Sequence, residues 1–128
     1  MAQVKVYGRR DVWAPRRAEV SDALQAALVG AWGLPAEKRF HRFLLLDADD
    51  LLAPARSAAY LVVEVVCFTG RSDGAVRRLL TAMYDDVAPA LGLTADDLEV
   101  VVVEVPASRW GIRGRAGDEL TLDYWVDV

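Results

Sequence analysis

The sequence feature that most constrains the fold is a short phrase that occurs twice. AWGLPAEKRF at residues 31–40 returns as ALGLTADDLE at residues 90–99, with two alanines, a glycine and a leucine at the same spacing. In both places the phrase follows an amphipathic segment and precedes an apolar run. The chain is therefore predicted to use one supersecondary unit twice, and each phrase marks the place where a helix stops and the next strand begins.

The first half of the chain predicts a strand, a helix and a second strand. Valines alternate with other residues at positions 4–7, which is the period of a half-buried strand. Pro15 suits the start of a helix because its missing N–H needs no partner there, and Gly33 suits the end. A second strand is expected at residues 39–46. The helical apolar stripe comprises Val20, Leu24, Ala27, Leu28 and Ala31.

The second half predicts the same order after a linker at residues 47–57. Strands are expected at residues 60–68 and 98–105, where apolar residues dominate. Ser72 is placed to cap the helix between them, and Pro89 predicts a kink or fraying in the last turn because it removes one helical hydrogen bond. The apolar stripe of this helix comprises Val76, Leu79, Leu80, Met83, Tyr84 and Val87.

The predicted fold is α/β, with one βαβ unit in residues 1–58 and a second in residues 59–128, which adds a C-terminal strand at Leu120–Val126. Each helix is a crossover connection, so the two strands of each unit are expected to be parallel. Two helices then cover one face of a four-stranded sheet. The runs LVVEVVCF and VVVVEV are apolar on both faces. Either the tail or, as we expect, other copies of the chain cover the second face.

Composition excludes several classes of function. The 128 residues fit a single domain. The net charge of −4 argues against nucleic-acid binding, and no apolar run is long enough for a membrane span. One histidine and one cysteine leave no zinc cluster, and no glycine-rich phosphate motif is present. We therefore expect no metal and no cofactor. The first residues lack the apolar stretch of a signal peptide, which predicts a cytoplasmic protein.

Five short motifs follow one another at a spacing that is typical of a known family. They are Gly33-Leu34-Pro35, Arg39-Phe40, Gly70-Arg71-Ser72, Glu104-Val105-Pro106 and Trp110-Gly111. With the duplicated βαβ unit, they resemble the tautomerase superfamily, in particular its malonate semialdehyde decarboxylase-like branch, over roughly residues 2–115. The resemblance implies a homotrimer in which a sheet of each subunit faces a central barrel.

The resemblance also implies chemistry at the N-terminus. Members of this family use an N-terminal proline, exposed when the initiator methionine is removed, as a general base or acid. Ala2 occupies that position here. A processed Ala2 carries a primary α-amine with a reference pKa of about 7.7–8.0, which is close enough to neutral for proton transfer. Where the decarboxylases of this branch have a water-handling carboxylate and a second arginine, this chain has Lys38 and Thr69.

Arg71 and Arg39 are the expected anion-binding residues. Arg71 lies between a strand end and a helix N-terminus, where the guanidinium and free N–H groups attract a carboxylate. Its alternative role is a solvated ion pair with Asp73. Arg39 matches the family motif, and its alternative role is a salt bridge between subunits.

Three further residues are candidates for the site. His41 follows Arg39 on the same face of its strand and precedes Arg42, so its pKa is expected to be lowered and it would act as a neutral base. The alternative is packing at a subunit seam. Trp110 and Ile112 resemble the apolar wall opposite the N-terminus in this branch; alternatively, Trp110 pins the tail to the core. Cys67 is expected to be a buried, inert thiol.

The sequence thus indicates an enzyme, or a recent descendant of one, acting on a small carboxylate substrate. The expected reaction is proton transfer, as in keto–enol tautomerisation or a related isomerisation of an oxo-acid or enol carboxylate. The alternatives are a catalytically silent trimeric binding or scaffold protein, and a tailoring enzyme, a cyclase or a decarboxylase, of specialised metabolism.

Overall fold

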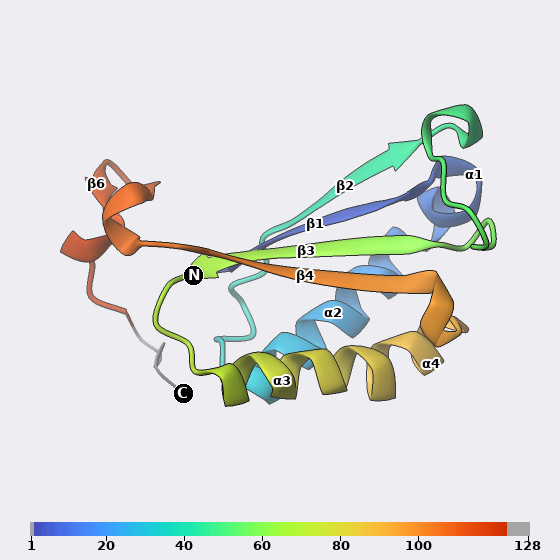
Figure 1. Cartoon of the computed structure of the whole chain (residues 1–128). Helices are drawn as coiled ribbons and strands as arrows, with labels where there is room; N and C mark the ends of the chain where they lie inside the picture. The colour runs from blue at the N-terminus through green and yellow to red at the C-terminus, as the bar shows by residue number, and fades with distance from the viewer. Residues whose placement is uncertain (1, 123–128) are drawn as a thin grey trace.

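The computed structural model describes residues 2–122, which form a four-stranded mixed sheet with helices on one face (Figure 1). The strand order is β2-β1-β3-β4. β1 runs parallel to β2 and β3 runs parallel to β4, while β1 and β3 are antiparallel at the centre. The predicted tandem βαβ fold is confirmed. The strands are β1 (Ala2–Arg9), β2 (His41–Leu46), β3 (Leu61–Phe68) and β4 (Leu98–Val105).

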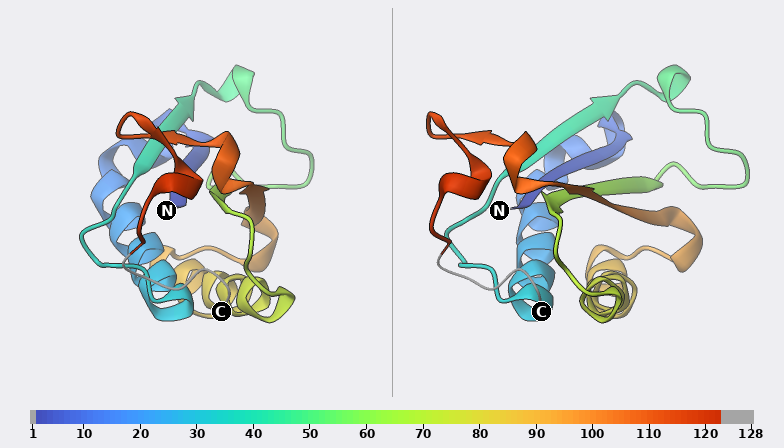
Figure 2. Two further views of the ribbon diagram at one scale, coloured as in Figure 1. Left: turned by 90° about the vertical axis from the view of Figure 1, so that its left-hand side faces the viewer. Right: turned by 60° about the vertical axis from the view of Figure 1, so that its left-hand side comes forward.

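The helices of both halves lie side by side beneath the sheet (Figures 1 and 2). Buried apolar residues of α2 and α3 meet the buried positions of the strands in one core. The predicted stripe of α2 faces this core. Of the second predicted stripe only Leu79, Met83 and Val87 are in the core, while Tyr84 is 38% exposed. The helical segments are α1 (Arg10–Trp13), η1 (Ala14–Arg16), α2 (Arg17–Trp32), η2 (Ala48–Asp50), α3 (Asp73–Ala82), the π-helix η3 (Met83–Val87), α4 (Ala88–Leu91) and η4 (Ala95–Asp97). Within residues 2–122, none of these helices has the length and apolar character that a membrane crossing requires.

Ser72, Gly33 and Gly92 end or cap helices as predicted. Pro15 does not open the first helix, because it lies in η1, after α1 and before α2. The Ser72 hydroxyl accepts a hydrogen bond of 3.0 Å from the Ala75 N–H and caps α3. Gly33 and Gly92 end the two helical segments with φ of 65° and 72°, the left-handed conformation that glycine adopts without a Cβ penalty. Pro89 does perturb its helix: the π-helical turn η3 ends two residues before it and shifts the hydrogen-bonding register around the missing donor.

The other face of the sheet is more polar than predicted. Along β1 and β3 every second residue is buried under the helices, and the alternate positions are partly exposed. On this open face the Tyr7 hydroxyl donates to Glu64 at 3.3 Å, so the centre of the sheet carries polar groups. β4 keeps apolar side chains there, with Val101 46% and Val103 39% exposed.

The segment after β4 forms a small arm beyond the end of the sheet (Figure 1). Its short β5–β6 ribbon turns at Arg113 and Gly114, both with positive φ. The predicted strand at Leu120–Val126 is not found in its described part, because residues 120–122 lie in neither helix nor strand; residues 123–126 are outside the described range. The elements of the arm are η5 (Ala107–Arg109), β5 (Gly111–Ile112), β6 (Arg115–Ala116) and η6 (Gly117–Glu119).

Candidate active site

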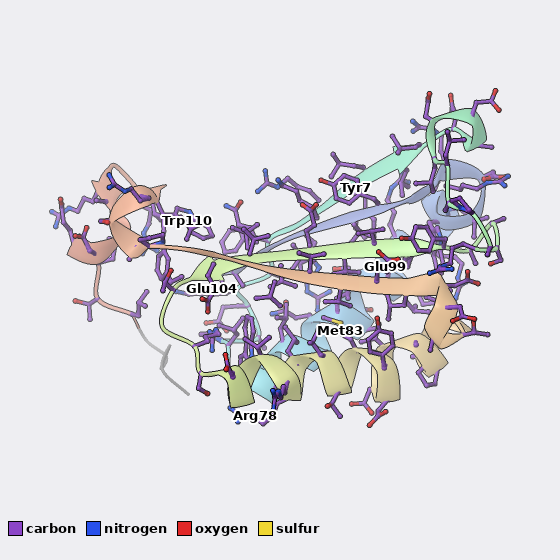
Figure 3. All side chains as sticks on the ribbon, viewed as in Figure 1. Tyr7, Arg78, Met83, Glu99, Glu104 and Trp110 are labelled. Atoms are coloured by element: carbon purple, nitrogen blue, oxygen red, sulfur yellow. The ribbon has the colours of Figure 1, made fainter. Side chains whose placement is uncertain are left out.

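One end of the sheet brings three reactive groups into a row. Ala2 at the start of β1 pairs with Cys67 near the end of β3, and Cys67 pairs with Glu104 near the end of β4. Paired residues on neighbouring strands point to the same side of a sheet. Ala2 and Cys67 are buried on the helix side, and Figure 3 shows Glu104 on that side of β4, above the start of α3. The antiparallel β1–β3 pair therefore places Ala2 beside the ends of both strands of the second unit.

Arg71 reaches this row from the turn between β3 and α3. Its guanidinium carbon lies 3.9 Å from the centre of the Trp32 ring, a stacking contact that fixes the plane of the guanidinium. The Trp32 indole N–H in turn donates to the Ala75 carbonyl at 2.9 Å. Arg71 is only 8% exposed. It is therefore held inside the site, and the alternative of a solvated ion pair with Asp73 is not what the structure shows.

Arg71 forms no ion pair with another residue in the range 2–122. Its Nε and Nη1 atoms are buried and make no hydrogen bond within that range. Burial lowers the pKa of Arg71, and the neighbouring Cys67 and Glu104 oppose this. The Cys67 thiol itself has its pKa raised by burial, against the pull of Arg71, so it stays neutral at pH 7. A buried cation without an anion is costly, and a carboxylate ligand would remove that cost.

Trp110 and Ile112 lie at the same end of the sheet, but not on the side that carries Ala2, Cys67 and Glu104 (Figures 1 and 3). The Trp110 ring packs edge-on against Phe68, with ring centres 5.1 Å apart at an interplanar angle of 82°. Phe68 follows Cys67 in β3 and therefore points to the opposite face. Figure 3 shows Trp110 above the sheet, away from Glu104. The Trp110 carbonyl accepts a 2.7 Å bond from the Gly117 N–H, which fixes the arm, and Ile112 belongs to its β5–β6 ribbon.

His41 and Arg39 line a separate cleft. It has a volume of about 400 Å³ and is lined by Gln3, Arg39, Phe40, His41 and Arg42. The His41 Nδ1 lies 2.7 Å from the Ser21 hydroxyl, and Arg39 donates to Asp22 at 2.5 Å. Burial and the charge of Arg39 lower the pKa of His41 to about 4, as predicted in direction. Among the described residues of one chain, no hydrogen bond or ion pair joins His41 or Arg39 to Arg71.

Sequence reasoning missed Trp32, Cys67 and Glu104 as neighbours of Arg71. Cys67 is buried as expected, yet its thiol lies beside the guanidinium. Strand alternation places Cys67 and Glu104 on the side of Val65 and Val102, so the pairing of β3 with β4 was the signal that could have found them. Trp32 sits one residue before the helix-ending Gly33. No local sequence pattern predicts its contact with Arg71, which is about 40 residues away in the sequence.

Comparison with known proteins agrees with this architecture. A family model described as "Tautomerase enzyme" matches residues 38–113. A malonate semialdehyde decarboxylase solved in wild-type, mutant and inactivated forms is 22% identical, with a TM-score of 0.80 over 93% of this chain and 99% of that one. Another malonate semialdehyde decarboxylase, inhibited by 3-bromopropiolate, is 25% identical, with a TM-score of 0.80 over 94% and 98%.

A native fused 4-OT gives a similar result, with 25% identity and a TM-score of 0.81 over 92% of this chain and 98% of that one. The family model covers more than half of the sequence, and the solved structures cover nearly all of both chains. Together, the family-model match and the shared architecture show that the chain belongs to the tautomerase superfamily.

Proposed function

We propose that this protein transfers a proton on a small oxo-acid or enol carboxylate, in a keto–enol tautomerisation or a related isomerisation. The observation that carries the proposal is Arg71, a buried cation whose Nε and Nη1 find no acceptor within residues 2–122. It lies beside the row formed by Ala2, Cys67 and Glu104. A substrate carboxylate on Arg71 would neutralise it and would bring the adjacent carbon atoms to the start of β1.

In this proposal Arg71 binds the carboxylate and the α-amine of Ala2 exchanges the proton at carbon, once Met1 has been removed. The ordinary pKa of such an amine, about 7.7–8.0, keeps both its protonated and its free form available near neutral pH. The amine lacks a proline ring, so β1 has to fix its direction. Backbone pairing with β3 at Cys67 supplies that constraint.

The remaining predicted site residues require a second copy of the chain if they belong to the same site. Arg39 and His41 line their own cleft, and Trp110 and Ile112 lie with the arm. We propose a homotrimer in which neighbouring copies bring these residues close to Arg71. Arg39 and His41 would then bind or polarise the substrate, and Trp110 and Ile112 would exclude water. Fused 4-OT proteins of the same fold are described as symmetric and asymmetric trimers.

The proposal is tested with phenylenolpyruvate and a set of 3-oxo acids as substrates, after intact-mass measurement of the N-terminus. Arg71→Ala is expected to lower kcat/KM by at least about 100-fold, since it removes a charge-assisted contact to the carboxylate in a buried site. Arg77→Ala is the matched control, because Arg77 is exposed on the neighbouring helix α3 and should change kcat/KM by less than about 2-fold. Turnover that survives Arg71→Ala would contradict the proposal.

A catalytically silent binding protein is the second candidate, favoured by the absence of proline at position 2. It predicts no turnover of any substrate in the set, together with carboxylate binding that Arg71→Ala abolishes. A retained Met1 would favour the same candidate, because the Ala2 nitrogen would then be an amide. A cyclase or decarboxylase would instead consume a 3-oxo acid with loss of carbon dioxide or with ring closure, which mass spectrometry of the products distinguishes.

A further inference from the structure

Among residues 2–122, Glu104 is a carboxylate that lies near Arg71 without pairing with it. It lies opposite Cys67 in the register of β3 and β4, on the side of the sheet that faces α3 (Figure 3). Its charge reaches both Cys67 and Arg71. Nevertheless, no ion pair or hydrogen bond joins Glu104 to another side chain within residues 2–122, and its side chain is exposed.

This arrangement leaves the charge of Arg71 for a ligand to neutralise. An ion pair would place a guanidinium nitrogen within 4 Å of the carboxylate, and Arg71 would then be neutralised by the protein itself. Instead, Arg71 is held back by the Trp32 ring at 3.9 Å, while Glu104 projects from the edge strand β4. The backbones of Ala2 and Glu104 are two strands apart, which is about 10 Å. A ligand carboxylate bound to Arg71 therefore has Glu104 on one side and Ala2 on the other.

We propose that Glu104 is a catalytic residue, the proton acceptor and donor for the oxygen of a carboxylate substrate held on Arg71. The inference rests on the proposed function and assigns the second of the two groups that a tautomerisation uses. One group must exchange a proton at carbon and another must exchange a proton at oxygen. Ala2 and Glu104 flank Arg71 from opposite ends of the row, which suits this division.

An enol carboxylate would react through two proton transfers. The Glu104 carboxylate accepts the enol hydroxyl proton, so the O–H bond breaks and its electron pair forms the C=O bond. The electron pair of the C=C bond takes a proton from the Ala2 ammonium and forms the new C–H bond. Glu104 is left as a carboxylic acid and Ala2 as a free amine. After the oxo-acid has left, water carries one proton from the acid to the amine. The reverse sequence forms the enol.

The other titratable groups near Arg71 suit this role less well. The Cys67 thiol is fully buried and its raised pKa disfavours the thiolate. His41 is held by Ser21 in the separate cleft. Glu104 alone combines an exposed oxygen pair, a position beside Arg71 and freedom from other partners in the described chain.

The test compares Glu104→Gln, Glu104→Asp and the control Glu37→Gln, an exposed glutamate outside the row. Glu104→Gln is expected to lower kcat for phenylenolpyruvate by about 100-fold or more, the usual contribution of a positioned acid–base group. Glu104→Asp keeps the carboxylate and should retain part of the activity. Proton NMR in deuterium oxide gives a second readout, because exchange of the carbon-bound proton of phenylpyruvate should slow in parallel. Glu37→Gln should leave both rates within about 2-fold.

Binding separates a catalytic from a merely structural role. 3-Phenylpropanoate carries the carboxylate but has no keto or enol oxygen, and calorimetry measures its affinity. Glu104→Gln should bind it as tightly as the wild type or a few-fold more tightly, since a negative charge beside Arg71 is removed. A kcat that stays within 3-fold of wild type in Glu104→Gln, or a loss of activity matched by weaker binding, overturns this inference alone. Absence of turnover by the wild type overturns the proposed function and the inference with it.

Discussion

At the scale of single residues, the candidate site centres on Arg71, whose buried Nε and Nη1 atoms have no hydrogen-bond partner within residues 2–122. Sequence placed Arg71 at a strand end before a helix, which the structure confirms. It could not show that Trp32 from the other half of the chain stacks on the guanidinium at 3.9 Å. Burial and stacking together hold the Arg71 side chain in place. This suits the proposed anion binding, because a ligand would not have to restrict a mobile side chain.

His41 provides a test of residue-scale electrostatics that is independent of activity. Its folded pKa of about 4 lies below the ordinary value of 6.5, so between these values the unfolded chain binds more protons than the folded one. The contribution of His41 to stability is therefore complete above pH 6.5 and is lost as pH falls towards 4, by at most about 3 kcal/mol. Urea unfolding of the wild type and of His41→Gln at pH 7.0, 5.5 and 4.5 should show this component only in the wild type. Equal pH dependence of both proteins would refute it.

At the scale of the elements, the sequence predicted most of the fold because each boundary carries a local chemical signal. The Ser72 cap, the Gly33 and Gly92 stops and the β4 limits at 98–105 all agree with the structure. Pro89 predicted a disturbed helix without specifying its form, since a kink, fraying and a π-helical turn all accommodate a missing N–H. The segment after β4 was poorly predicted, because two-residue strands and single helical turns have no periodicity to detect.

Glycine-to-alanine substitutions at the two helix ends and inside a helix are predicted to have opposite effects on the free energy of unfolding. Gly33→Ala and Gly92→Ala should each destabilise the protein by about 1 kcal/mol, because alanine in the left-handed conformation is strained although no atom crowds the added methyl group. Gly30→Ala lies inside α2, also in open space, and should stabilise by about 0.5–1 kcal/mol. Urea unfolding measures all three. A stabilising Gly33→Ala would show that the turn has relaxed.

At the scale of the whole molecule, the open face of the sheet decides whether one chain is complete. Sequence predicted the helices on one face correctly but overstated the apolar character of the other, because Glu64 and the polar positions of β1 fall on it. The apolar part is concentrated on β4, which is also an unpaired edge strand. The sequence also did not predict that Arg71 and Trp110 lie on opposite sides of the sheet. Trp110 packs on Phe68, whereas Arg71 lies beside Cys67, and consecutive strand residues point to opposite sides.

This distribution predicts where copies of the chain meet. Val101 and Val103 are 46% and 39% exposed on the open face of β4, and a lysine in their place would bury an unpaired charge in any interface formed there. Sedimentation equilibrium at micromolar concentration should give three chains for the wild type and a single chain for Val101→Lys/Val103→Lys. Leu52→Lys, at a side chain 87% exposed in the linker, should leave the wild-type assembly unchanged.

Because the proposed site needs Arg39, His41 and Trp110 from neighbouring copies, the dissociated variant should lose turnover while its far-ultraviolet circular dichroism stays native. A monomeric wild type with full activity would place every catalytic group within one chain and would leave Arg71, Ala2 and Glu104 as the whole site.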